Sequence, residues 1–150
     1  GRLNVCLALA ILSVAQASPT SWDSRVAAGS MLATDVPADF LQYDPQNLPI
    51  VANGFVGTLI DSNTTYISGV YNGFSSVTPS HRARIPGTLS ITVMNSNPTA
   101  AALDMESAEF ILLGELGSLQ VEQRTYAHRS LRSLLVHEIT LCPPEYGGCD

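Results

Sequence analysis

Residues 54–71 read GFVGTLIDSNTTYISGVY. Two runs rich in β-branched and aromatic residues, Gly54–Ile60 and Thr64–Tyr71, flank the polar cluster Asp61–Asn63. Val, Ile, Thr, Phe and Tyr pack well on a pleated surface, whereas Asp, Ser and Asn favour tight turns. This stretch therefore predicts a β-hairpin.

The sequence on the C-terminal side of this hairpin predicts further β-strands. Apolar and polar residues alternate over Thr88–Val93, as in a strand with one solvated face, and Asn95–Pro98 is expected to end that strand. Three further strands are expected over Leu103–Leu113, Leu119–Tyr126 and Leu134–Leu141, although Ala, Met and Glu in 101–110 also suit a helix. About six strands without a convincing helix predict a mainly β fold, an antiparallel sandwich.

The sequence on the N-terminal side of the hairpin begins with a segment typical of a secretory leader. Arg2 precedes the apolar run Val5–Leu12, and Ala15 and Ala17 follow it, which is the layout of a secretory signal peptide. The run is shorter than the about 20 residues that span a bilayer. We therefore expect a signal peptide over 1–17, an irregular arm over 18–47 and a partial sandwich domain over 48–150, in a secreted protein without a membrane span. The alternative is a buried N-terminal helix in a cytoplasmic protein.

Cysteine usage agrees with secretion. Cys6 would leave with the leader, so Cys142 and Cys149 remain as a possible disulfide. Two thiols are half of a tetrahedral metal shell, and no metal site is expected. Asn63-Thr64-Thr65 is a usable glycosylation sequon, whereas Pro98 blocks the one at Asn97.

The charge balance excludes one class of partner. The chain has 150 residues, a net charge of −6, and seven basic residues, all arginine and scattered. Without a basic stripe it is a poor ligand for phosphate backbones, so no nucleic acid partner is expected. With 45% hydrophobic and 13% charged residues it is also unlike a disordered acidic tail. No motif for a cofactor is found.

Catalytic constellations are equally hard to find. No serine lies in a Gly-x-Ser-x-Gly elbow, and the histidines have no metal-binding spacing. Glycosidic chemistry needs two carboxyl groups across the scissile bond. The pairs Glu106 with Glu109 and Glu115 with Glu122 are nominal candidates only, because most acids on strands are simply solvated.

Three clusters are less ordinary: Asn53–Thr58, Ser68–Gly73 and Ser80–Pro86. In the simplest interpretation their glycines permit turns and close strand approach. His81 and Arg82 would then hydrogen-bond backbone at a sheet corner.

These clusters, in this order and together with Tyr126–Leu131, resemble the N-terminal region of glycoside hydrolase family 65. The resemblance runs from about Leu48 to Leu141. It implies an incomplete β-supersandwich belonging to a larger enzyme, whose (α/α)6 barrel is absent from this chain. It also implies an inverting reaction, with a glutamic acid and a second carboxylate on that barrel.

For the branch of the family that this chain resembles, the implied reaction releases glucose from the glucosyl-galactosyl unit on collagen hydroxylysine. The glycan or glycopeptide substrate would bind through the missing barrel. We therefore expect no catalytic residue in this chain, which alone should be inactive. Its role would be scaffold and domain interface, and the residues expected near that interface or the site are Asn53, Gly54, Tyr71, Asn72, His81 and Arg82.

Two alternatives stay open. A disaccharide phosphorylase or trehalase of the same family fits equally well, because barrel loops would choose the substrate. The other is a secreted, non-catalytic β-sandwich that binds carbohydrate or protein through its loops.

Overall fold

A computed structural model describes residues 20–35, 48–73, 81–86, 93, 95–143 and 149. Within these residues the elements are α1 (Thr20–Ala27), β1 (Met31–Asp35), β2 (Ile50–Ala52), β3 (Val56–Leu59), β4 (Thr64–Ile67), β5 (Tyr71–Asn72), β6 (His81–Arg82), β7 (Ile85–Pro86), β8 (Asn97–Asp104), β9 (Glu109–Leu116), β10 (Leu119–Ala127) and β11 (Leu135–Cys142).

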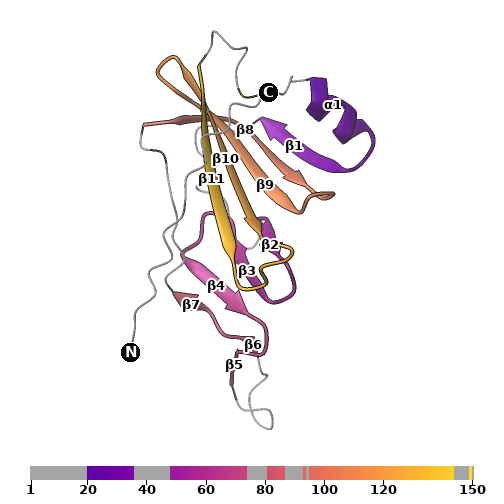
Figure 1. The fold of residues 1–150 in the computed structure, drawn as a ribbon, viewed down its shortest axis with the longest axis vertical. Coiled ribbons are helices and arrows are strands. Elements are labelled where there is room, and N and C mark those ends of the chain that lie inside the picture. Colours follow the sequence, from indigo (N-terminus) through magenta and orange to yellow (C-terminus); the bar gives the residue numbers. More distant parts are fainter. Residues whose placement is uncertain are drawn as a thin grey trace.

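The strands form two main antiparallel sheets. The five-stranded sheet has the order β1-β8-β9-β10-β11, the four-stranded sheet has the order β2-β3-β4-β7, and β5 pairs with β6. In Figure 1 the short strands β2, β3 and β4 lie beside the lower halves of the long strands β10 and β11. The prediction of a mainly β, antiparallel fold is confirmed.

The core lies where the two sheets face one another. Val51 of β2 and Ile60, directly after β3, form one buried cluster with Ala101 and Phe110 of the long sheet, and Leu112 packs against it. Thr58 is buried as well, and its hydroxyl donates to the carbonyl of Thr64 at 2.9 Å. Because a buried hydroxyl must find a partner, this bond makes Thr58 compatible with the core.

A second cluster covers the opposite face of the long sheet. Met31, Ala102 and Ile111 are buried there, and Trp22 of α1 and Leu113 pack against them. The expectation of an irregular arm over 18–47 is wrong for its described part, since that part contains α1 and β1. The sequence of the arm has no regular apolar pattern that would predict a strand. Strand β1 forms because the distant strand β8 supplies its hydrogen-bond partners.

The hairpin over residues 54–71 is confirmed. β3 and β4 pair antiparallel, with Val56 opposite Ile67. The strand expectations for Leu119–Tyr126 and Leu134–Leu141 are also confirmed, by β10 and β11. The predicted strand Thr88–Val93 lies outside the described residues except for Val93.

Two strand boundaries were predicted incorrectly. Leu103–Leu113 is not one strand but the end of β8, a turn over 105–108 and the start of β9. The carboxylate of Asp104 accepts hydrogen bonds from the backbone N–H groups of Glu106 and Ser107. Hydrogen bonds from an Asp side chain to the amides that follow it stabilise a turn, so the chain reverses its direction here. The Asn95–Pro98 cluster begins β8 at Asn97, and a bulge next to Pro98 accommodates the proline.

Gly114 permits this bulge. It pairs with Pro98, and a Cβ atom at position 114 would lie 2.9 Å from the carbonyl oxygen of Asn97. Real Cβ atoms do not approach a carbonyl so closely, so β8 and β9 can pack at this point only with glycine.

A disulfide joins Cys142, the last residue of β11, to Cys149. The two Cα atoms are 5.3 Å apart, and the backbone N–H of Cys149 donates to the side-chain oxygen of Gln120 at 2.8 Å. These contacts hold position 149 against the ends of β10 and β11.

Candidate functional site at the motif-bearing end

The side chain of Asn53 connects two motif clusters that are far apart in the sequence. Its amide nitrogen donates to the carbonyl oxygens of His128, at 2.8 Å, and Arg132, at 3.0 Å. Its oxygen accepts from the backbone N–H groups of Phe55 and Val56, both at 3.0 Å. Both donors and both acceptor positions of the amide are thus used. We call this arrangement the Asn53 clamp.

The clamp holds the loop after β10, and hydrogen bonds within that loop also fix its conformation. The Nδ1 atom of His128 accepts from the N–H groups of Ser130, at 3.1 Å, and Leu131, at 3.0 Å, so the proton of the neutral ring is on Nε2. The guanidinium of Arg132 lies over the ring of Phe55, 4.6 Å from its centroid. A cation above an aromatic face is attracted by the ring's electrons, which adds a second link between loop and hairpin.

The other residues expected at an interface fall into two groups. Gly54 has a φ of +87°, a conformation natural for glycine, and it follows the clamp residue directly. Tyr71 and Asn72 form β5 and pair with Arg82 and His81 of β6. His81 is placed by its backbone pairing alone.

A shallow groove brings members of both groups together. It has a volume of about 280 Å³ and is lined by Ile50, Ala52, Gly54, Val56, Gly57, Tyr66 and Arg82. The lining is mostly apolar, with one guanidinium at its edge. Gly54 and Arg82 are therefore neighbours in space, while Asn53 is occupied by the clamp. Contact of the six residues with another domain stays a prediction.

We call the part of the molecule formed by the Asn53 clamp, the loop after β10 and strands β5 and β6 the motif-bearing end, and it carries exposed arginines. Arg82, Arg84, Arg129 and Arg132 are exposed, and in the described part of the chain none of them forms an ion pair. Phe55, Leu131 and Tyr71 expose large apolar side chains nearby, at 46%, 60% and 53%. Exposed aromatic and aliphatic side chains together with arginines are typical of an interaction surface.

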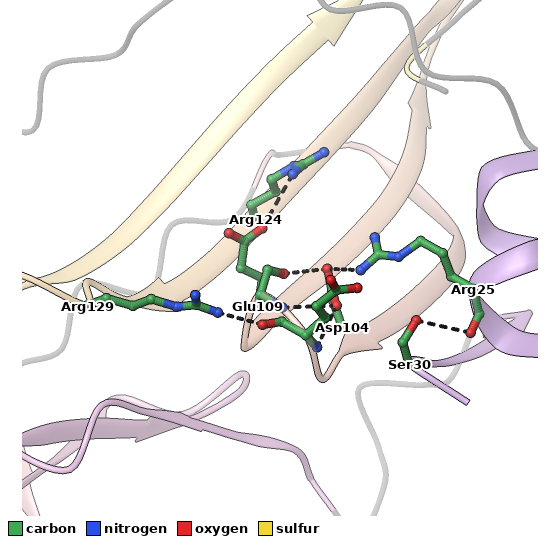
Figure 2. A network of polar contacts seen from close by, with 8 residues as sticks. Arg25, Ser30, Asp104, Glu109, Arg124 and Arg129 are labelled. Carbon is green, nitrogen blue, oxygen red and sulfur yellow. Dashed lines mark hydrogen bonds and ion pairs between the residues drawn. The ribbon is translucent and has the colours of Figure 1, made fainter. Parts of the chain in front are cut away.

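A second, polar pocket lies on the face covered by α1 (Figure 2). It has a volume of about 620 Å³ and is lined by Arg25, Asp104, Glu106, Ser107, Glu109, Tyr126, Ala127, His128 and Arg129. Sequence reasoning did not find it, because its residues come from α1, the end of β8, the turn that follows, the start of β9, the end of β10 and the loop after β10. Only the nominal pair Glu106 and Glu109 pointed toward it.

Asp104 is the anchor of this pocket. It is only 3% exposed, forms an ion pair with Arg25, and accepts hydrogen bonds from the Ser107 hydroxyl and two backbone amides. Burial opposes its ionisation, but these partners outweigh burial and lower the pKa of Asp104 to about 2. The carboxylate is thus fully engaged in building the turn.

Neither nominated pair of acids is a free catalytic pair. Arg124 forms ion pairs with Glu109, at 3.4 Å (Figure 2), and with Glu122. Burial raises the pKa of Glu109, and the nearby Arg124 offsets part of this rise. Burial also raises the pKa of Tyr126, and the charge of Glu138 adds to the rise. These groups therefore influence one another's ionisation across β9, β10 and β11.

His137 is also structural. It lies on β11 opposite Thr125, whose hydroxyl is 3.1 Å from its Nδ1 atom. Burial lowers the pKa of His137, and its Nε2 atom is buried without a hydrogen-bond partner in the described part of the chain. Within the same residues no group of three or more His, Cys, Asp or Glu could hold a metal ion, and none of the helices is long and apolar enough to cross a membrane.

Among the known proteins to which this chain is similar are three named protein-glucosylgalactosylhydroxylysine glucosidase. The one from Dictyostelium discoideum is 34% identical over 134 residues, which cover 81% of this chain and 18% of the relative. The relatives from Mus musculus and Gallus gallus are 33% and 32% identical, and each match covers 67% of this chain and 15% of the relative. No protein-family model matches the chain, and no solved structure matches it.

Replacing Asn53 by alanine should destabilise the chain by about 2 kcal/mol, because two carbonyls and two amides lose their partner. Urea unfolding measures the change. The matched control is Asn63→Ala, since Asn63 is exposed and no hydrogen bond of its side chain is found in the described structure. Equal stability of the two variants would contradict the clamp.

Acid should weaken the fold through Asp104. Its pKa rises from about 2 in the folded chain to the ordinary 3.8 on unfolding, so its stabilisation is complete above pH 3.8 and is lost as the pH falls toward 2. The loss amounts to about 2 kcal/mol. Unfolding free energies measured from pH 6 to pH 2 should fall more steeply for the natural chain than for Asp104→Asn. Parallel pH profiles would show that the folded chain does not stabilise the ionised form of Asp104, and would contradict the prediction.

Proposed function

Because most of this chain is homologous to protein-glucosylgalactosylhydroxylysine glucosidases, we propose that it is the sandwich segment of a glucosidase of that kind. The parent protein would release glucose from the glucosyl-galactosyl unit on hydroxylysine. The carrying observation is the 34% identity over 134 residues. The chain spans only 15–18% of the length of these relatives, so the activity belongs to the proposal.

The catalytic acid and base of the parent would come from other parts of the polypeptide. Glycosidic hydrolysis needs one carboxyl group to protonate the leaving oxygen and another to activate water or attack the sugar. In this chain Asp104 is bound by Arg25, and Glu109 and Glu122 are bound by Arg124. Asp104, whose pKa is lowered to about 2, is a poor base and a poor proton donor at neutral pH, and arginine occupies the carboxylates of Glu109 and Glu122, which supports a non-catalytic role for this segment.

We infer that the role is that of a scaffold with an interface at the motif-bearing end. The Asn53 clamp immobilises the loop after β10, and this order would serve a surface that must keep its shape. Exposed Phe55 and Leu131 with the surrounding arginines match the apolar centre and charged rim of such surfaces. The proposed partner is the remainder of the parent polypeptide.

A secreted, non-catalytic binding module is the second candidate. The polar pocket beside α1 favours it, since it offers arginine, histidine and tyrosine donors next to carboxylate acceptors. Hydroxyl-rich ligands are recognised by such mixed groups. A phosphorylase or trehalase remains the alternative within the enzyme class.

The decisive experiment assays the complete parent polypeptide for glucose release from glucosyl-galactosyl-hydroxylysine. We expect glucose without any need for phosphate, and none from residues 1–150 alone. Release of glucose 1-phosphate only with added phosphate would indicate the phosphorylase, and hydrolysis of trehalose alone would indicate the trehalase. If the parent polypeptide has none of these activities, the proposed glucosidase function is wrong and the non-catalytic binding module takes its place.

The interface is tested by removing one exposed apolar side chain from the parent polypeptide. Leu131→Ser should lower its unfolding temperature and its activity, because Leu131 would lose apolar burial against the rest of the protein. Leu32→Ser is the matched control, since Leu32 is 62% exposed, like Leu131 at 60%, but lies on β1 away from the motif-bearing end (Figure 1). Equal effects of the two substitutions would contradict an interface at Leu131.

A further inference from the structure

The turn between β3 and β4 presents the acceptor of an unblocked glycosylation sequon. Asn63 is exposed in this turn, directly before the first residue of β4, and Thr65 supplies the hydroxyl two positions later. The chain's other Asn-x-Ser/Thr match, Asn97-Pro98-Thr99, is blocked by its proline and begins strand β8. The acceptor amide is therefore available to a large modifying group.

The turn is built by atoms other than those of Asn63. The Ser62 N–H donates to the Leu59 carbonyl at 3.2 Å, and the Ser62 hydroxyl accepts from the Thr64 N–H at 3.1 Å. The Thr58 hydroxyl binds the Thr64 carbonyl, and Asp61 takes the positive φ, 58°. A substituent on the Asn63 amide would break none of these contacts. At Asn53 the same substituent would break two hydrogen bonds of the clamp.

The disulfide is an independent indication of the same compartment. Cys142 and Cys149 are bonded, and such bonds form and persist in the oxidising secretory pathway, where asparagine is also glycosylated. The apolar run Val5–Leu12 with Ala15 and Ala17 behind it has the layout of a leader into that pathway. The sequon, the disulfide and the leader thus depend on different residues and agree.

We propose that Asn63 carries an N-linked oligosaccharide. The donor is a polyprenyl-diphosphate-linked oligosaccharide of the secretory pathway. The bond between the sugar's C1 and the diphosphate oxygen breaks, and its electron pair leaves with the polyprenyl diphosphate. The Asn63 Nδ2 atom forms the new bond to C1 and gives one proton to a base of the transferase.

The position of the sugar has a consequence for assembly. Neither groove described above is lined by residues 61–63, so the oligosaccharide leaves both open. It would keep the β3–β4 turn in solvent and exclude that turn from contact with the rest of a larger protein. The inference holds whichever sugar the parent enzyme hydrolyses, and it restricts docking to other surfaces such as the motif-bearing end.

The test uses the parent polypeptide produced with its own leader in a eukaryotic cell. Trypsin should release the segment 26–82, since Arg25 and Arg82 are consecutive basic residues of the chain. Peptide N-glycosidase in heavy-oxygen water should convert Asn63 of this peptide into labelled Asp. An unmodified Asn63 in the mature, disulfide-bonded protein would overturn the proposal.

Matched variants separate modification from folding. Asn63→Gln and Thr65→Val should each abolish the electrophoretic shift caused by the enzyme, while Thr65→Ser should keep it because the hydroxyl remains. The Asn63→Gln variant should also unfold at the same temperature as the enzymatically deglycosylated natural protein, since the side chain at position 63 is exposed. A shift that persists in Asn63→Gln would place the sugar elsewhere and refute the assignment.

Discussion

The burial of Val51 and Ile60 against Ala101 and Phe110 is the contact on which the rest of the structure depends. Strands β2 and β3 have three and four residues, too few for an independent sheet. They become stable only by covering the apolar face of the long sheet. This packing also carries Asn53, next to the end of β2, to the loop after β10, where its amide satisfies two backbone carbonyls.

The two faces of the long sheet have different chemistry as a result. One face packs against the short sheet and is apolar. The other face carries the apolar cluster under α1 and, beside it, the ion pairs of Asp104, Glu109 and Glu122 with arginines. Arg25 and Arg124 pair with these acids, whereas Arg82, Arg84, Arg129 and Arg132 are exposed and form no ion pair in the part of the chain that the structure describes.

Much of the fold could be predicted from local patterns. The hairpin around Asp61–Asn63 follows from turn residues between β-branched runs, and β10 and β11 follow from their apolar content. The turn over 105–108 could not be predicted, because it depends on whether Asp104 bonds the amides beyond it or points to solvent. Helix α1 has little apolar periodicity of its own, and the packing of Trp22 near Met31 and Ile111 stabilises it.

For the candidate site, the order of the motif clusters was enough to indicate the kind of relative that the comparisons found, and the spacing of Cys142 and Cys149 was enough to suggest a pair. The sequence by itself thus determined the β-rich character, the turn at Asn63 and the resemblance, since each depends on residues close together in the chain. Tertiary structure alone decided that Asn53 contacts the loop 75 residues later and that Arg25 neutralises Asp104. The physical reason is that hydrogen bonds and ion pairs require atoms within a few ångströms, and only the packing of the two sheets and α1 sets those distances.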